Sequence, residues 1–466
     1  MVAMFIMCIS YSGVTQDYFS TTLTANDYID KGGIVKFNDQ PIITSSELCN
    51  GFIGRECTYL LGLDEDSPEI TYLADLGELE LFDKSIVADS EKLTVAGLDE
   101  DKNLKLIQFD TSLEKIKEAS HDIGASLGYW VFGMTEFSGY YVVSIFKFGN
   151  DDANFPTLFW YGTEDLSFQG SFTMEEASTS FQELSVDNDN NLRVIHQKDE
   201  GHDVLTFNSD MELIDTMELP DEGGLGSLNF EVLSNEDLVL GLHGLQYLIR
   251  YDSDGTEIWK VNVAEAFDVN QVKFVREIKE VSNGGIMLCG SLKKNADDYF
   301  GFIYMVNSDG EEQWKRLYKT QNGTHTFPLK GFVELENEGF LFYGALREEQ
   351  FPSNNTFHDT HWVLKTDQNG CIEDGCGEQI ITSVDQPMFN HIILSPNPVV
   401  SDVEISGIED FTSPQFKVVD IQGRVIMDDK INKDRTIDLS TLSSGIYFMH
   451  VIDGKKVITI QKFIKS

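Results

Sequence analysis

The sequence predicts an all-β chain, a β-propeller followed by a smaller β module, and three observations support this. Residues 31–385 alternate short apolar strands with polar turns, at a period of roughly 46–56 residues. No long helical pattern interrupts that region. From residue 391 the pattern changes, so residues 391–466 are expected to fold as a separate module.

The repeat combines two kinds of strand–turn–strand segment. One is represented by "FEVLSNEDLVLGLHG" (230–244) and the other by "IYMVNSDGEEQWKRLY" (303–318). Paired, they give units that start near residues 31, 84, 136, 183, 230, 276 and 332. Units of four strands at this period are typical of propeller blades. The sequence therefore favours seven blades, with six or eight left open.

Charge limits the class of partner. The formal net charge is −44, yet residues 386–466 hold ten Asp and Glu against nine Lys and Arg. The remainder carries 68 acids against 25 bases, a net of −43. Such a field disfavours nucleic acid and anionic membranes, and no apolar run reaches the length of a membrane span. It favours solubility and cationic partners, including calcium.

The N-terminus and the cysteines indicate export. Residues 1–15 form an apolar run that ends in small residues, typical of a secretory signal peptide with cleavage before Gln16; a buried N-terminal strand is the alternative. Because no positive charge precedes this run, the true start is expected a few residues earlier. Cys49 with Cys57, and Cys371 with Cys376, are spaced as local disulfides, whereas Cys289 lies in an apolar strand and is expected to be an inert thiol.

Two units carry the motif G-x-x-x-W, at Gly255 to Trp259 and Gly310 to Trp314. This motif resembles the tryptophan-docking motif of quinoprotein-type propellers. The resemblance implies that each indole packs between neighbouring blades, and it concerns the scaffold alone. The catalytic apparatus of those enzymes is not recognisable in this sequence.

The C-terminal module carries its own ordered motifs. They are the S-P-N-P entry with Pro396, Asn397 and Pro398, the D-I-Q-G-R-V turn with Gly423, the L-S-S-G-I-Y-F strand with Gly445 and Tyr447, and a basic last strand. Together they resemble the C-terminal sorting domain of the type IX secretion pathway in the Bacteroidetes. The resemblance implies an immunoglobulin-like β-sandwich read by an outer-membrane translocon, and a secreted or surface-held cargo that has crossed the periplasm.

Candidate chemistry in the repeats is sparse. Asp187, Asp189 and Asn191 copy the first half of a calcium loop but lack its Gly and its bidentate Glu, so turn acids are the alternative. No nucleophile elbow, P-loop or H-E-x-x-H motif is present. Segments 121–135 and 347–361 are expected at blade edges, where their aromatic residues could stack on sugars or anchor loops.

Three functions remain open on the sequence. The first is a secreted or surface-displayed binding or adhesion propeller for a glycan or a protein. The second is a secreted polysaccharide hydrolase or lyase with its active site at the channel mouth, and the third is a surface scaffold. Saturable binding without product, new chain ends, or retention in the envelope would distinguish them.

Overall fold

The computed structural model describes most of the chain. The described residues are 19–24, 32–48, 56–63, 70–82, 84–123, 128–148, 155–174, 180–198, 201–220, 228–242, 246–269, 271–295, 298–320, 326–336, 339–351, 356–372, 376–382, 393–395, 398–406, 414–420, 424–431, 435–453 and 456–465. The chain divides into two compact units. The larger contains residues 15–68 and 73–384, and the smaller contains 1–14, 69–72 and 385–466.

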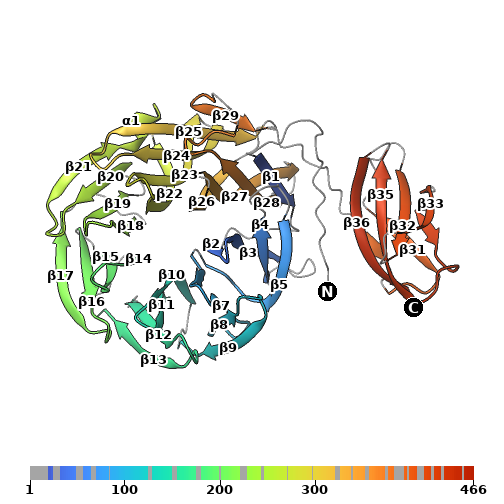
Figure 1. The fold of residues 1–466 in the computed structure, drawn as a ribbon, viewed down its shortest axis with the longest axis horizontal. Helices are drawn as coiled ribbons and strands as arrows, with labels where there is room; N and C mark the ends of the chain where they lie inside the picture. Colours follow the sequence, from blue (N-terminus) through green and yellow to red (C-terminus); the bar gives the residue numbers. More distant parts are fainter. Residues whose placement is uncertain are drawn as a thin grey trace. The chain divides into compact units, whose positions relative to one another are not determined.

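Within the described residues, the larger unit contains seven antiparallel sheets of propeller type (Figure 1). The first sheet has β2 (Ile34–Phe37), β3 (Gln40–Leu48), β4 (Glu56–Leu63) and β5 (Ile70–Glu78), of which residues 73–78 belong to the larger unit. The second has β6 (Ile86–Ala88), β7 (Leu93–Leu98), β8 (Leu104–Phe109) and β9 (Lys115–His121). The third has β10 (Gly128–Phe137), β11 (Tyr140–Phe148), β12 (Phe155–Gly162) and β13 (Phe168–Thr173).

The next three sheets follow the same plan. The fourth has β14 (Ser180–Val186), β15 (Leu192–Gln197), β16 (His202–Phe207) and β17 (Leu213–Leu219). The fifth has β18 (Leu228–Val232), β19 (Leu238–Leu242), β20 (Tyr247–Tyr251) and β21 (Glu257–Asn262), and the short α1 (Val263–Ala266) follows it. The sixth has β22 (Gln271–Glu280), β23 (Ile286–Asn295), β24 (Asp298–Val306) and β25 (Glu312–Thr320).

The seventh sheet joins the two ends of the propeller. Its strands are β26 (Thr326–Glu334), β27 (Phe340–Phe351), β28 (Thr356–Thr366) and, as the outermost strand, β1 (Phe19–Thr24). Strand β1 pairs antiparallel with β28, with Phe19 opposite Lys365. After β28 the chain adds β29 (Gln379–Thr382) in parallel to β25, as a fifth strand of the sixth sheet.

The sheets form a closed ring in which the first strand of each is innermost. The innermost strands contact one another in the series β2, β6, β10, β14, β18, β22 and β26, and β26 contacts β2 again. Central strands are covered on both faces by neighbouring sheets, so β7 and β16 are buried at every position. Outer strands such as β9 are mostly exposed. This burial explains the apolar runs at the centre of each unit.

The acidic turns of the repeat are braced by their own side chains. In the second, fourth, fifth and sixth sheets, the turn before the outer strand starts with an Asp or Asn whose Oδ1 accepts backbone N–H groups two and four residues later, as at Asp252 (3.0 and 2.8 Å) and Asn307 (3.0 and 2.9 Å). The fourth residue of this turn has positive φ. Asp, Asn and Gly recur here because these turns require them.

That positive-φ position joins adjacent sheets. The indole of Trp259 on β21 packs on Gly310 in the next sheet, where a Cβ would lie 2.8 Å from Cδ2, and its N–H donates to Ser308 O at 2.9 Å. Trp314 on β25 packs in the same way on Gly370. In the fourth sheet the equivalent residue is Met211, whose own buried side chain occupies the space between sheets.

The smaller unit packs two sheets around one core. One sheet has β30 (Ile393–Ser395), β31 (Asp402–Ser406) and β34 (Thr436–Asp438). The other has, in spatial order, β33 (Val425–Lys430), β32 (Pro414–Asp420), β35 (Gly445–Asp453) and β36 (Lys456–Lys465). Val403, Val418, Met449 and Phe463 are central to this core.

The predicted all-β fold, a propeller with a small sandwich, is confirmed, and several local expectations are corrected. The third sheet starts at Gly128, not near residue 136, because the apolar run 128–137 is a bulged inner strand and not a loop at a blade edge. Most of segment 347–361 extends the long strands β27 and β28, so it is no simple loop insertion. Neither β1 nor β29 was anticipated.

Candidate functional site

Polar side chains on the innermost strands link neighbouring sheets at one repeated position. Glu183 on β14 accepts the Phe230 N–H through Oε2 at 2.7 Å. Glu277 on β22 likewise accepts the Phe332 N–H at 2.6 Å. Asn229, at the equivalent place on β18, donates to the carbonyl oxygen of Val275. Each link therefore runs to the next sheet around the ring.

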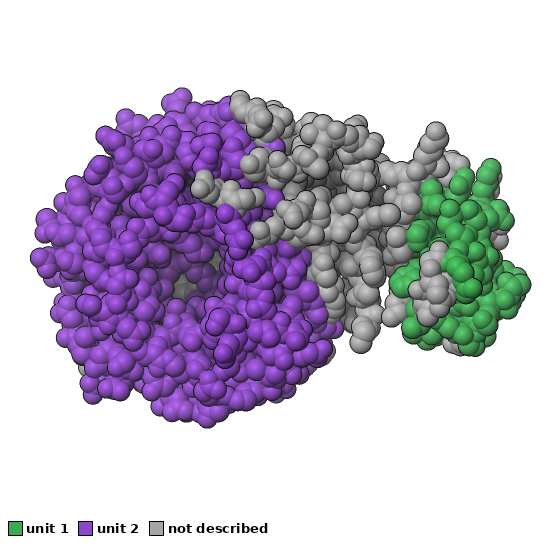
Figure 2. Space-filling view, viewed as in Figure 1, with its two compact units in different colours: residues 1–14, 69–72, 385–466 green, residues 15–68, 73–384 purple. Residues whose placement is uncertain are grey.

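Two lysines bring positive charge to these carboxylates. Lys279 Nζ lies 2.6 Å from Glu277 Oε1 and donates to Phe332 O at 3.1 Å. Lys84, from the second sheet, pairs with Glu183 of the fourth. Its side chain passes the third sheet at Gly133, where a Cβ would lie 3.6 Å from the Lys84 Cβ. This pair thus lies on the inner side of the ring, whose centre is hollow in Figure 2.

Glu231 is the remaining charged group of this set. It lies two residues beyond Asn229 on β18, on the same face of the strand. Burial raises its pKa to about 7, and the positive charges of Lys84 and Lys279 only partly oppose that effect. Its carboxylate makes no hydrogen bond or ion pair with other described residues. We refer to Lys84, Glu183, Glu231, Glu277 and Lys279 as the channel cluster.

The channel cluster can exchange a proton near neutral pH and bind polar groups. Burial alone would lower the pKa of Lys279, but the Glu277 carboxylate outweighs it and the pKa is raised. Lys279 therefore carries positive charge near a carboxyl that is half protonated near pH 7. Cys289, opposite Glu277 on β23, is a fully buried free thiol whose pKa burial raises well above its usual range. It is consequently a poor nucleophile.

The residues proposed for calcium serve a turn. Asp187 Oδ1 accepts the Asn191 N–H at 2.7 Å, and Oδ2 accepts Arg193 Nε at 2.8 Å and Asn191 Nδ2 at 3.1 Å. Asp189 is exposed at the tip of the same turn. A carboxylate that is paired with a guanidinium has little capacity left for a cation. The geometry therefore agrees with the alternative, in which Asp187 stabilises the turn. In the described part of the chain, no group of three or more His, Cys, Asp or Glu side chains is placed to hold a metal ion.

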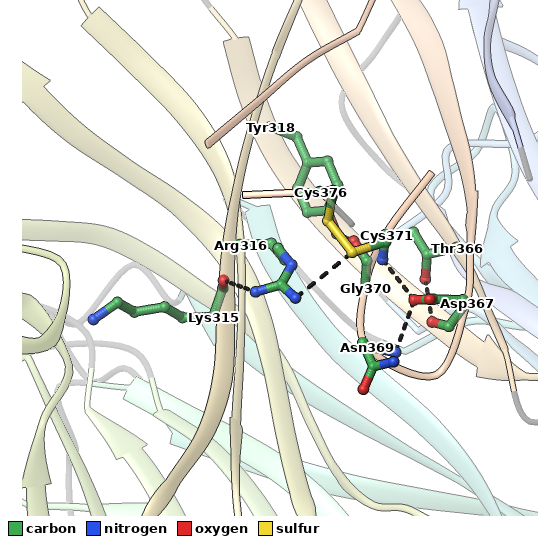
Figure 3. Close-up of a disulfide and its surroundings, with 9 residues drawn as sticks. All are labelled: Lys315, Arg316, Tyr318, Thr366, Asp367, Asn369, Gly370, Cys371 and Cys376. Atoms are coloured by element: carbon green, nitrogen blue, oxygen red, sulfur yellow. Dashed lines mark hydrogen bonds between the residues drawn. A yellow bond between two sulfur atoms is a disulfide. The ribbon is translucent and has the colours of Figure 1, made fainter. Parts of the chain in front are cut away.

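The structure contains the Cys371–Cys376 disulfide, with Cα atoms 5.6 Å apart. It follows β28, and Figure 3 shows the guanidinium of Arg316 directed at the Cys371 sulfur, 3.6 Å away. Tyr318 donates its hydroxyl hydrogen to Gly370 O beside it. The disulfide therefore lies where the chain passes from the seventh sheet to β29 on the sixth. Cys49 lies outside the described residues, so the pair with Cys57 stays a prediction.

The remaining predicted residues fall in several places. Gly255, with φ +81°, faces Met217 of the preceding sheet, so Gly255, Trp259, Gly310 and Trp314 all lie at sheet-to-sheet contacts. In the small unit Pro398 is exposed, Gly445 begins β35, and Tyr447 donates to Ser443 O at 3.0 Å. Residues 1–15, Pro396, Asn397 and Gly423 lie outside the described residues.

Sequence reasoning missed the channel cluster. A weak signal is present in the sequence. In "EIKEVSNGG" (277–285) the first turn of the unit opens at Val281, and Glu277 and Lys279 lie four and two positions before it. In "EVLSNED" (231–237) the turn opens at Leu233, and Glu231 lies two positions before it. Among 78 acidic residues these look like ordinary surface charges. Only closure of the ring brings Lys84 to Glu183.

Comparison with known proteins identifies the end of the chain. Residues 394–466 match the secretion system C-terminal sorting domain, so the chain carries a type IX sorting domain and is a cargo of that pathway, secreted or held at the cell surface. No curated protein matches the sequence. No helix among the described residues is long and apolar enough to cross a membrane.

Several solved structures resemble the chain in shape. Virginiamycin B lyase from Staphylococcus aureus is 11% identical, with 74% of this chain and 98% of that chain covered and a TM-score of 0.41. The N11 neuraminidase-like protein of a flat-faced bat influenza virus is 9% identical, with 79% and 97% covered and a TM-score of 0.42. A protein of unknown function from Bacteroides caccae is 12% identical, with 63% and 94% covered and a TM-score of 0.40. Similarity at this level indicates nothing about ligand or activity.

Proposed function

We propose that the propeller is a secreted binding module and that its ligand enters the centre of the ring beside Glu231. The observation that carries this proposal is the Glu231 carboxyl, which is half-buried on the inner strand β18 and makes no hydrogen bond or ion pair with other described residues, and whose pKa burial raises to about 7. A polar group that loses part of its hydration without gaining a hydrogen bond in the protein is available to a ligand. A ligand that donates hydrogen bonds would supply the missing partner.

The surrounding charges define the ligand class. With a net charge of −44, the chain repels sulfated and uronate polymers, so a neutral glycan or a peptide with free amines fits better. Glycan hydroxyl groups donate to carboxylates without bringing negative charge. Lys84 and Lys279 hold Glu183 and Glu277 in place, which leaves Glu231 to meet the ligand.

The test is a panel of neutral and charged polysaccharides and of cationic peptides, offered to the purified full-length protein with calcium and with a chelator. The informative variant is Glu231→Gln, and the matched control is Glu257→Gln on the exposed outer strand β21. We expect saturable binding that Glu231→Gln weakens about tenfold, or by about 1.4 kcal/mol, while Glu257→Gln retains it. Equal binding by both variants would place the ligand elsewhere.

A second function rests on the same carboxyl. Glycoside hydrolysis needs one protonated carboxylic acid and one ionised carboxylate. Glu231 is about half protonated near pH 7, so it can act as the acid, whereas Glu183 and Glu277 are paired with lysines. The same panel, assayed for new reducing ends, tests this function. Hydrolysis that is abolished in Glu231→Gln would favour the enzyme over the binding module. Absence of both binding and product would favour a scaffold.

A further inference from the structure

Exposed apolar side chains concentrate in the small unit. Ten large hydrophobic residues are exposed among the described residues, and five of them lie in this smaller unit: Val400, Val425, Ile426, Ile446 and Ile464. Isolated apolar residues on a surface need no explanation, but a contiguous group indicates a contact with another molecule. Their positions on the sheet therefore matter.

Most of this group shares the outer face of one sheet. On β35, Tyr447, Met449 and Val451 point into the core, so the alternation of the strand directs Ile446 and Phe448 outward. Ile446 lies directly opposite Ile464 on β36, where the two side chains are 43% and 44% exposed.

The apolar surface continues across the sheet. Phe448 lies opposite Val419 on β32, and Val419 in turn lies opposite the exposed Val425 on β33. Val419 is only 8% exposed although it points outward, as expected if its apolar neighbours cover it. We call Val419, Val425, Ile446, Phe448 and Ile464 the outer apolar face.

Charged residues bound this face at one end. Lys417 and His450 lie opposite each other further along β32 and β35, and Lys417 pairs with Asp428 on β33 at 3.4 Å. An apolar centre with a polar rim is the usual composition of a protein interface. Lys417 and Asp428 neutralise each other, and Lys462 on β36 lies opposite Phe448, so the face has an apolar centre with one further basic position at its β36 edge.

We propose that the outer apolar face is the surface by which the type IX machinery holds this module. The family match is confined to residues 394–466, so the module is defined independently of the propeller it exports. The segment 386–466 has a net charge of −1, against −43 for the rest of the chain. A near-neutral apolar contact suits a partner that must accept the same module on differently charged cargo. The propeller of the same chain and a second copy of the chain are the other occupants to be tested.

The first test is secretion of the full-length protein by a bacterium with the type IX pathway. Ile446→Thr/Ile464→Thr keeps β-branched residues on the strands while it removes the apolar contact. We expect the secreted fraction to fall about tenfold, with the precursor retained in the periplasm. The matched control is Ile258→Thr, which changes an apolar residue that is 49% exposed on the outer strand β21 of the larger unit, outside the sorting module.

Folding and occupancy are measured separately. The double variant should keep the wild-type thermal transition, so that lost secretion does not report unfolding. Secretion at the wild-type level, or an equal loss in Ile258→Thr, would overturn the proposal. A photo-crosslinking residue at position 446 should give an adduct with an identified type IX component, absent from a strain without the translocon. Crosslinks only within the chain, or only to a second copy, would also overturn it.

Discussion

Gly310 offers the sharpest test of how adjacent sheets are joined. In Gly310→Ala the new Cβ would lie 2.8 Å from Cδ2 of Trp259, in a turn with φ +79°. The backbone conformation costs a non-glycine residue about 1–2 kcal/mol. Forcing the indole aside adds about 1–3 kcal/mol, as overpacking does elsewhere. The total is a loss of about 2–5 kcal/mol in the free energy of unfolding.

The chain supplies a matched control for the backbone contribution. Gly284 has φ +77°, but a Cβ added there would meet nothing within 4 Å, so Gly284→Ala should cost only about 1–2 kcal/mol. Urea denaturation followed by far-UV circular dichroism measures both variants. In a Trp259→Ala background the extra cost at Gly310 should vanish, a coupling of about 1–3 kcal/mol. Equal losses at Gly310 and Gly284, or no coupling to Trp259, would refute the docking argument.

Three further predictions concern charge and covalent links. The pKa of Glu231 rises from 4.5 to about 7 on folding, so between these values the folded protein binds a proton that the unfolded chain has lost. The free energy of unfolding should therefore fall as pH rises from about 4.5 to 7, by at most about 3 kcal/mol. Glu231→Gln should flatten this dependence, measured by urea denaturation at pH 5 and pH 8, and an unchanged slope would contradict it. Cys371→Ser/Cys376→Ser opens a short loop and should cost about 2 kcal/mol in unfolding free energy, with faster hydrogen exchange in β29; unchanged exchange there would show that the disulfide does not hold the strand. Asp237→Ala leaves Arg250 buried without its ion pair (2.6 Å) and should cost about 3–5 kcal/mol by thermal unfolding, so a loss below about 1 kcal/mol would indicate that water compensates.

The repeat could be read from the sequence because its signals are local. A strand, a polar turn and a second strand each depend on neighbouring residues, and Asp252 and Asn307 occupy the turn positions that their chemistry suits. The G-x-x-x-W motif was also informative, although its two residues serve different contacts: Gly310 receives the indole of the preceding sheet, and Trp314 packs on the following one.

Long-range pairings had no such signal. Strand β1 pairs with β28, which lies far away in the sequence, and β29 pairs in parallel with β25 of the preceding sheet. Short apolar segments such as these do not specify their partners. The channel cluster was missed for the same reason. Glu231 differs from other glutamates only in the groups around it, Lys84 from the second sheet and Lys279 from the sixth.

The pairing of β1 with β28 has a consequence for the order of folding. Six sheets of the ring can form from strands that are neighbours in the sequence, but the seventh needs residues 19–24 and 356–366 together. Contacts between such distant segments form slowly because a long loop must close first. During export, the ring therefore cannot close before β28 is available. Once β28 has formed, its outer edge is unpaired until β1 of the same chain reaches it, and it could accept the β1 of another copy. Crowding at this stage would favour strand-swapped dimers over closed monomers.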